Sequence, residues 1–171
     1  MIRKAKVADV EAMVQIINER AALGELLPRS RHHIYQNLRD FVVCERDGQI
    51  VGTGAMHVLW SDLGEIRALV VAPPWQGQGI GTAIVQALLE EARHLGLPRV
   101  FAFTYKPGFF ERLGFYLVDK ETLPRKVWGE CIHCVKFPNC DEVALVFDLS
   151  NSPKSTVRSP KPSGFGLKTG N

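Results

Sequence analysis

Apolar side chains recur along this chain with two periods, one typical of helices and one typical of buried strands. Two amphipathic helices are predicted, and their apolar faces consist of Val10, Met13, Val14 and Ile17 in the first and of Ile80, Ile84, Leu88, Ala92 and Leu95 in the second. We expect Asp9 to cap the first helix, Ser30 to cap a shorter helix around Ile34, and Gly96 to end the long one.

Short apolar runs bounded by turn residues predict strands over residues 2–6, 41–45, 50–60, 65–71, 99–104, 115–118 and 143–149. Asp47-Gly48 predicts a hairpin turn between the second and third strands, because this pair tolerates positive φ angles. The glycines of the third strand predict a bulge. With a short helix over 107–113, the order of elements indicates an α/β fold. The strand–helix–strand unit of 65–104 should form a right-handed parallel crossover.

The composition of the 171 residues, with 46% hydrophobic and 23% charged, is that of one soluble globular domain. Residues 151–171 contain four basic side chains and no acidic one, so this Ser/Pro/Gly-rich tail carries +4, whereas residues 1–150 sum to −1. We therefore expect a folded domain over 1–150 and a disordered tail over 151–171. No signal peptide or membrane span is recognisable, and no basic face indicates nucleic acid, so a cytoplasmic location is expected.

A glycine-rich turn separates the strand over 65–71 from the long helix. Gly77, Gly79 and Gly81 would expose backbone N–H groups at the beginning of that helix, where the helix dipole also favours a phosphate group. No Lys-Ser or Lys-Thr pair follows, which excludes a Walker P-loop, and the spacing differs from the dinucleotide-binding pattern. The alternative is a turn that merely reverses the chain.

Two motifs in this region resemble those of the GNAT acetyltransferases. Gln76-x-x-Gly79-x-Gly81 is similar to the pyrophosphate-binding motif of that family, and the segment 109–115 is similar to its later motif near the thioester. The resemblance covers residues 2–149. It implies the GNAT fold, a mixed and mostly antiparallel sheet of six or seven strands flanked by about four helices. It also implies an acetyl-CoA-dependent N-acetyltransferase that needs no metal.

By this resemblance, backbone groups of Leu69 and Val71 would pair with the pantetheine arm of acetyl-CoA, and an amide near Leu69 or Val70 would stabilise the oxyanion. The amides of 76–82 would hold the pyrophosphate. The complete set of implied cofactor-binding residues is Leu69, Val70, Val71, Gln76, Gly77, Gln78, Gly79, Ile80, Gly81, Thr82 and Phe110.

The chemistry of acetyl transfer needs a base for the acceptor ammonium and, in some enzymes, an acid for the leaving thiolate. Strand alternation would place Glu65, Arg67, Leu69 and Val71 on one face, and the position of Glu65 before the motif resembles that of the catalytic glutamate in several family members. Glu65 is therefore the proposed base, and an ion pair with Arg67 or another basic group is the alternative interpretation.

The family's tyrosine acid is replaced here by Phe110, which cannot donate a proton. Tyr105 is the candidate substitute, and departure of the unprotonated thiolate is the alternative.

A closer resemblance concerns the acceptor. The segments Ile2-Arg-Lys-Ala, Leu26-Leu-Pro-Arg-Ser-Arg31, Gly64-Glu-Ile-Arg67 and Leu123-Pro124 are similar to the acetyltransferase domain of N-acetylglutamate synthases, in a short form without an amino-acid-kinase domain. This implies that L-glutamate is the acceptor, in arginine biosynthesis, and it allows a homodimer. Arg29, or alternatively Arg31, would contact the glutamate carboxylate, and Arg67, Lys126 or Lys136 would supply a second cation.

Three other interpretations remain open at this stage: a GNAT enzyme for another amine, a non-catalytic acyl-CoA sensor, and a nucleic-acid-binding module. Cys131, Cys134 and Cys140, with His133, lie close together in the segment before the last strand. We expect these thiols to pack over the acceptor site, while a zinc site or a redox role is the alternative. Cys44 stands alone in an apolar run and is expected to be buried.

Overall fold

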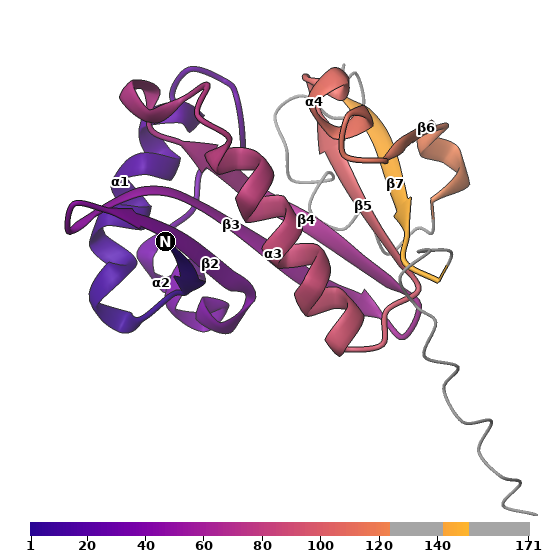
Figure 1. The fold of residues 1–171 in the computed structure, drawn as a ribbon, viewed down its shortest axis with the longest axis horizontal. Coiled ribbons are helices and arrows are strands. Elements are labelled where there is room, and N and C mark those ends of the chain that lie inside the picture. Colours follow the sequence, from indigo (N-terminus) through magenta and orange to yellow (C-terminus); the bar gives the residue numbers. More distant parts are fainter. Residues whose placement is uncertain (124–141, 151–171) are drawn as a thin grey trace, which may run out of the picture.

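The computed structural model of the protein describes residues 1–123 and 142–150. These residues form a seven-stranded sheet and four α-helices, as expected for the fold (Figure 1). The strands are β1 (Ile2–Lys4), β2 (Phe41–Arg46), β3 (Gln49–Trp60), β4 (Leu63–Val71), β5 (Arg99–Thr104), β6 (Tyr116–Val118) and β7 (Val143–Asp148). The helices are α1 (Val10–Ala21), α2 (Arg31–Gln36), α3 (Ile80–His94) and α4 (Pro107–Glu111).

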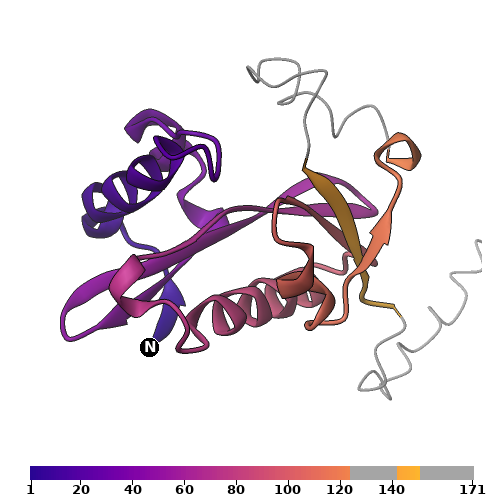
Figure 2. The same ribbon diagram turned by 90° about the horizontal axis from the view of Figure 1, so that it is seen from above.

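The sheet has the strand order β1-β2-β3-β4-β5-β7-β6. All neighbouring strands are antiparallel except β4 and β5, which are parallel and are joined through α3. The parallel crossover predicted for 65–104 is therefore confirmed. Figure 2 shows α1 and α2 on one face of the sheet and α3 and α4 on the other. None of the described helices is long and apolar enough to cross a membrane.

The two faces of the sheet carry separate cores. The face covered by α3 and α4 packs around Ile84, Leu88 and Phe110, and the face covered by α1 and α2 packs around Met13, Ile17 and Phe41. Gly54 shows how closely α3 approaches the sheet, because a Cβ atom there would lie 2.9 Å from Cγ2 of Ile84. The apolar faces predicted from the sequence are thus the faces that the sheet buries, except that Leu95, expected on the face of the long helix, follows the end of α3 and is 57% exposed.

A bulge in β4 changes the face of its side chains. Thr53 pairs with Val70, but Ala55 pairs with Arg67, so two residues of β4 lie opposite one residue of β3. Within this bulge Ala68 has a positive φ of 51°. The glycines of β3 predicted a bulge here, but the extra residue belongs to β4, the neighbouring strand.

The bulge contradicts the expectation that Glu65, Arg67, Leu69 and Val71 share a face. Leu69 and Val71 pack on the α3 side, together with Ile66, whereas Arg67 lines a hollow with residues of the α2 region. An extra residue shifts the alternation of side chains by one position, so odd-numbered residues before and after Ala68 point to opposite faces. The alternation of residues in the sequence could not by itself predict that shift.

Of the three expected helix ends, two are confirmed and one is wrong. The hydroxyl of Ser30 accepts a hydrogen bond from the His33 amide at 3.0 Å, and Gly96, with a φ of 81°, follows the end of α3. Asp9 occupies the N-cap position of α1, but its side chain accepts no hydrogen bond from an α1 amide. Its carboxylate instead accepts two hydrogen bonds from the Arg3 guanidinium, at 2.7 and 2.9 Å, and one from the Lys6 amide at 2.7 Å.

This arrangement predicts a pH-dependent contribution of Asp9 to stability. The hydrogen bonds from Arg3 hold the pKa of the Asp9 carboxyl below its usual value. Because the pKa is lower in the folded state, the stabilisation is complete above the unfolded pKa of about 3.9 and is lost as the pH falls through the folded pKa. We expect Asp9→Asn to lower the free energy of unfolding by about 1–3 kcal/mol at pH 7.

Urea denaturation of both proteins at pH 7 and at successively lower pH measures this effect, and the difference between them should shrink as Asp9 becomes protonated. Glu11→Gln is the matched control, because Glu11 is an exposed carboxylate bound to Arg31 and should contribute little at any pH. Equal stability of wild type and Asp9→Asn at pH 7 would contradict the prediction.

Candidate active site

The turn before α3 has the backbone geometry of a phosphate site. Gly77 and Gly79 have φ angles of 77° and 80°, which explains the glycines, and a Cβ atom at either position would meet nothing within 4 Å. The Ala83 amide donates to the Gly79 carbonyl at 3.0 Å. The N–H groups of Ile80, Gly81 and Thr82 therefore belong to the first turn, where an α-helix provides no acceptor. These residues fit a group that presents phosphate oxygens.

The two parallel strands next to this turn are paired over only part of their length. The register between β4 and β5 runs from Gly64 with Val100 to Ile66 with Ala102, although β4 continues to Val71. The Ala72 amide donates to the Val51 carbonyl at 2.8 Å, and by the alternation of an antiparallel ladder the backbone groups of Val71 then face the β5 side. The strand thus offers backbone hydrogen-bonding groups beside the turn.

Side chains around the turn fix its position. Nε2 of Gln76 donates to the Val71 carbonyl at 3.0 Å, so this side chain fastens the turn to the end of β4. The ring of Phe109 lies 3.4 Å from the place a Cβ atom would take at Gly81. Phe110, which the sequence nominated, is buried in the core between Phe109 and Phe115, with ring centroids 5.1 and 5.0 Å away. Phe109 is thus the aromatic residue at the turn, which sequence analysis missed.

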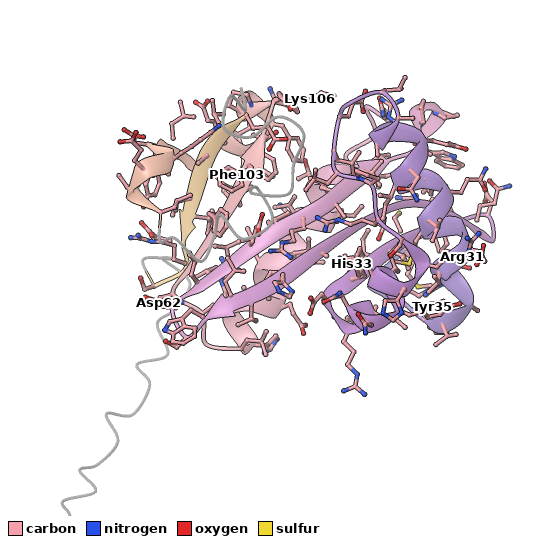
Figure 3. The ribbon with its side chains drawn as sticks, turned by 180° about the vertical axis from the view of Figure 1, so that it is seen from behind. Arg31, His33, Tyr35, Asp62, Phe103 and Lys106 are labelled. Atoms are coloured by element: carbon pink, nitrogen blue, oxygen red, sulfur yellow. The ribbon has the colours of Figure 1, made fainter. Side chains whose placement is uncertain are left out.

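On the opposite face of the sheet, the side chains before α2, in α2 and on β3 and β4 line a hollow that is open to solvent. Its lining consists of Arg29, His33, Asn37, Asp40, Phe41, Ala55, His57, Arg67 and Ala68. The hollow therefore reaches the bulge of β4. In Figure 3, His33 lies beside the strands, whereas Arg31 and Tyr35 lie on the outer side of α2.

Arg29 and Arg31 have different environments, which separates the two alternatives left by the sequence. Asn18 of α1 holds the backbone of Arg29 with two hydrogen bonds, at 2.8 and 2.9 Å, and Nη1 of Arg29 lies 3.4 Å from Nε2 of His33. Arg31 instead forms an exposed ion pair with Glu11, at 2.6 and 2.9 Å. Of these two arginines, Arg29 alone is among the residues that line the hollow.

Glu65 and Arg67 form an ion pair on the same face, with 2.7 Å between Oε2 and Nε. Both side chains are about nine-tenths buried, at 10% and 11% exposure. An ion pair with Arg67 is the alternative role that the sequence analysis left open for Glu65. It also fixes the guanidinium of Arg67 beside the hollow, so the structure brings Arg29 and Arg67 to one place although they are 38 positions apart.

A histidine–carboxylate pair also lines the hollow and was missed by sequence analysis. Nδ1 of His57 lies 2.7 Å from Oδ2 of Asp40, and His57 on β3 is directly opposite Glu65 on β4. Asp40 ends a short 3₁₀ helix (Leu38–Asp40) just before β2. The only signal in the sequence is a polar residue on an otherwise apolar strand, which does not reveal its partner.

The other residues nominated from the sequence either lie elsewhere in the fold or fall outside the described residues. Tyr105 is half-buried between β5 and α4, and Cys44 is buried in β2 as expected. Lys126, Lys136, Cys131, Cys134 and Cys140 lie outside the described residues. Within 1–123 and 142–150, no group of three or more His, Cys, Asp or Glu side chains is placed to hold a metal ion.

Comparison with known proteins agrees with this geometry. The chain matches the profile of the Acetyltransferase (GNAT) family over residues 11–115. It is 36% identical over 148 residues to an uncharacterized N-acetyltransferase of Chlorobaculum tepidum, covering 86% of this chain and 96% of that protein. It is 41% identical over 133 residues to an amino-acid acetyltransferase of Mycobacterium tuberculosis, covering 76% of each.

Among solved structures, the fold is similar to that of N-acetylglutamate synthase from Neisseria gonorrhoeae, complexed with coenzyme A and N-acetyl-glutamate. The TM-score is 0.80 at 27% identity, over 87% of this chain and 35% of that longer chain. The matched profile, the crossover with its glycine turn and the partly paired β4 and β5 lead to one conclusion. The chain belongs to the GNAT family and is an acetyl-CoA-dependent acetyltransferase.

Proposed function

We propose that this enzyme transfers the acetyl group of acetyl-CoA to the α-amine of L-glutamate and so forms N-acetylglutamate, a step of arginine biosynthesis. The observation that carries the proposal is the pair of arginines, Arg29 and Arg67, that line one hollow beside the bulge of β4. Arginine binds carboxylates through two parallel hydrogen bonds. Two arginines from separate elements suit an acceptor that has two carboxylates.

The charges around the hollow support an anionic acceptor. The acidic side chains Asp40 and Glu65 are each bound to a basic partner, His57 and Arg67 respectively. Neither carboxylate is therefore arranged to attract a polyamine or another cation. The names of two relatives agree with an amino-acid acceptor, since one is an amino-acid acetyltransferase and the other was solved with N-acetyl-glutamate.

The other proposed roles follow from the geometry of the turn and of β4. The amides from Gly77 to Thr82 would hold the phosphates of acetyl-CoA, which supplies the activated acetyl group, whereas the Gln76 amide, also expected there, donates to the Pro73 carbonyl at 3.2 Å. The backbone at the bulge, at Leu69 or Val70, would donate to the oxyanion. Glu65, the base that the resemblance implies, would have to act from within its ion pair with Arg67. For the leaving thiolate, Tyr105 remains the proposed acid, because Phe110 has no proton to donate.

The test is thiol release from acetyl-CoA with a panel of amines that includes L-glutamate, L-glutamine, L-aspartate and a polyamine. We expect saturable turnover with L-glutamate, and weaker turnover with L-glutamine, because an amide cannot replace a carboxylate in a salt bridge to arginine. Turnover with the polyamine alone would contradict the anionic acceptor. Binding of acetyl-CoA without turnover of any amine would instead favour an acyl-CoA sensor.

A further inference from the structure

The His57–Asp40 pair has no role in the function proposed so far, yet it lies where the acceptor amine should be. Both residues line the same hollow as Arg29, Arg67 and the bulge residue Ala68. His57 is also the cross-strand partner of Glu65. A histidine bound to a carboxylate is a common arrangement for proton transfer, because the carboxylate fixes the ring and stabilises its charged form.

The hydrogen bond determines which nitrogen of His57 can accept a proton. Nδ1 lies 2.7 Å from Oδ2 of Asp40, and an ionised carboxylate can only accept hydrogen bonds. Nδ1 therefore carries the hydrogen of the neutral ring, and the lone pair is on Nε2. This is the tautomer that a general base needs, with its donor nitrogen held by the protein and its acceptor nitrogen available for the substrate.

The charged groups around His57 make it a more suitable proton acceptor than Glu65. Protonation of Glu65 would break its 2.7 Å ion pair and remove the negative partner of a nearly buried Arg67. Protonation of His57 would instead strengthen its contact with Asp40, because the imidazolium and the carboxylate attract each other. The other titratable or charged side chains that line the hollow are Arg29 and His33.

We propose that His57 is the catalytic base that deprotonates the acceptor, and that Asp40 is a positioning residue that holds its ring. In this step an N–H bond of the acceptor ammonium breaks, and its electron pair stays on nitrogen as the lone pair that attacks the acetyl group. The proton forms a new N–H bond at Nε2 of His57, and the imidazolium later returns it to solvent. The assignment relies on the proposed function only in placing the acceptor amine at this hollow.

The kinetic test compares His57→Gln, Asp40→Asn and Glu65→Gln with wild type, using the amine that gives the highest turnover. We expect His57→Gln to lower kcat by about 100- to 10,000-fold, with little change in acetyl-CoA affinity, since a positioned general base contributes about that factor. The acid limb of the kcat/KM profile should disappear in His57→Gln. It should remain in Glu65→Gln, whose main effect should be a higher KM for the acceptor through a displaced Arg67.

His32→Gln is the matched control, because His32 is exposed on α2 and does not line the hollow. It should keep the kcat and the pH profile of wild type. Asp40→Asn should lower kcat less than His57→Gln does. The opposite pattern, with the acid limb kept in His57→Gln and lost in Glu65→Gln, would overturn the proposal and identify Glu65 as the base.

A second measurement does not depend on any acceptor. Nitrogen-15 NMR of the histidine rings in the full-length protein should show neutral His57 with its hydrogen on Nδ1, and a loss of that preference in Asp40→Asn. A neutral ring protonated mainly at Nε2 would overturn the proposal whichever amine is acetylated. Because the kinetic comparison uses the most active amine, a failure of L-glutamate as acceptor would refute the proposed substrate and leave the result for His57 unaffected.

Discussion

Replacing Arg29 by alanine is expected to lower kcat/KM for L-glutamate by about 100-fold, mainly through a higher KM. The backbone of Arg29 exchanges two hydrogen bonds with the side chain of Asn18, and the Arg29 side chain lines the hollow, within reach of a carboxylate bound there. Loss of a charge-assisted, bidentate contact removes about 2–3 kcal/mol of binding free energy, which corresponds to that factor. The fold should be unaffected, because the side chain belongs to neither core.

Steady-state kinetics of thiol release, with acetyl-CoA saturating, measures this effect. Arg31→Ala is the matched control, since Arg31 is also a cation of the same segment but is exposed and bound to Glu11. It should leave kcat/KM within about twofold of wild type, as is usual for loss of an exposed ion pair. Equal losses in the two variants would refute the assignment of Arg29 to the acceptor site, as would an unchanged KM in Arg29→Ala.

Replacing Gly79 by alanine is expected to weaken the binding of acetyl-CoA by about tenfold or more. The φ of 80° at Gly79 disfavours any residue with a Cβ atom, by about 1–2 kcal/mol. The added methyl group would also point into the open space beside the first turn of α3, where the phosphates should lie. A dissociation constant for coenzyme A, measured by calorimetry, should therefore rise even where the protein remains folded.

Gly96→Ala separates these two causes. Gly96 has a φ of 81°, and a Cβ atom there would also meet nothing within 4 Å, but it lies at the other end of the same helix. Both variants should lose similar stability in thermal unfolding, and Gly79→Ala alone should lose affinity for coenzyme A. Similar affinities in the two variants would show that the glycine turn does not hold the phosphates.

The bulge of β4 illustrates how a small local feature governs the chemistry of the site. With unbroken alternation, Glu65 and Arg67 would share a face with Leu69 and Val71, which pack on the α3 side. The extra residue at Ala68 directs Arg67 to the other face, beside Arg29. In the proposed function, the strand would therefore offer backbone groups at one edge to the pantetheine arm while the side chain of Arg67 faces the hollow.

Sequence patterns determined the elements, the crossover and the glycine turn. These signals are local, because each depends on a few consecutive residues. Examples are the periodicity of the helices, the Asp47-Gly48 turn, in which both φ angles are positive, and the glycine at the beginning of α3. The resemblance to known motifs added the family. Among the helix ends, only the capping role of Asp9 was wrong, because Arg3, six residues earlier, binds its carboxylate instead.

The tertiary structure alone decided which side chains meet around the hollow between the α2 region and the sheet. Arg29 with Arg67 and Asp40 with His57 are pairs from separate elements, and their meeting depends on strand register, on the bulge and on the packing of α2 against the sheet. A one-residue change in register would send the two side chains on strands, His57 and Arg67, to the opposite face. The chain's own sequence therefore determines the cofactor turn, whereas its three-dimensional packing determines the chemistry offered to the acceptor.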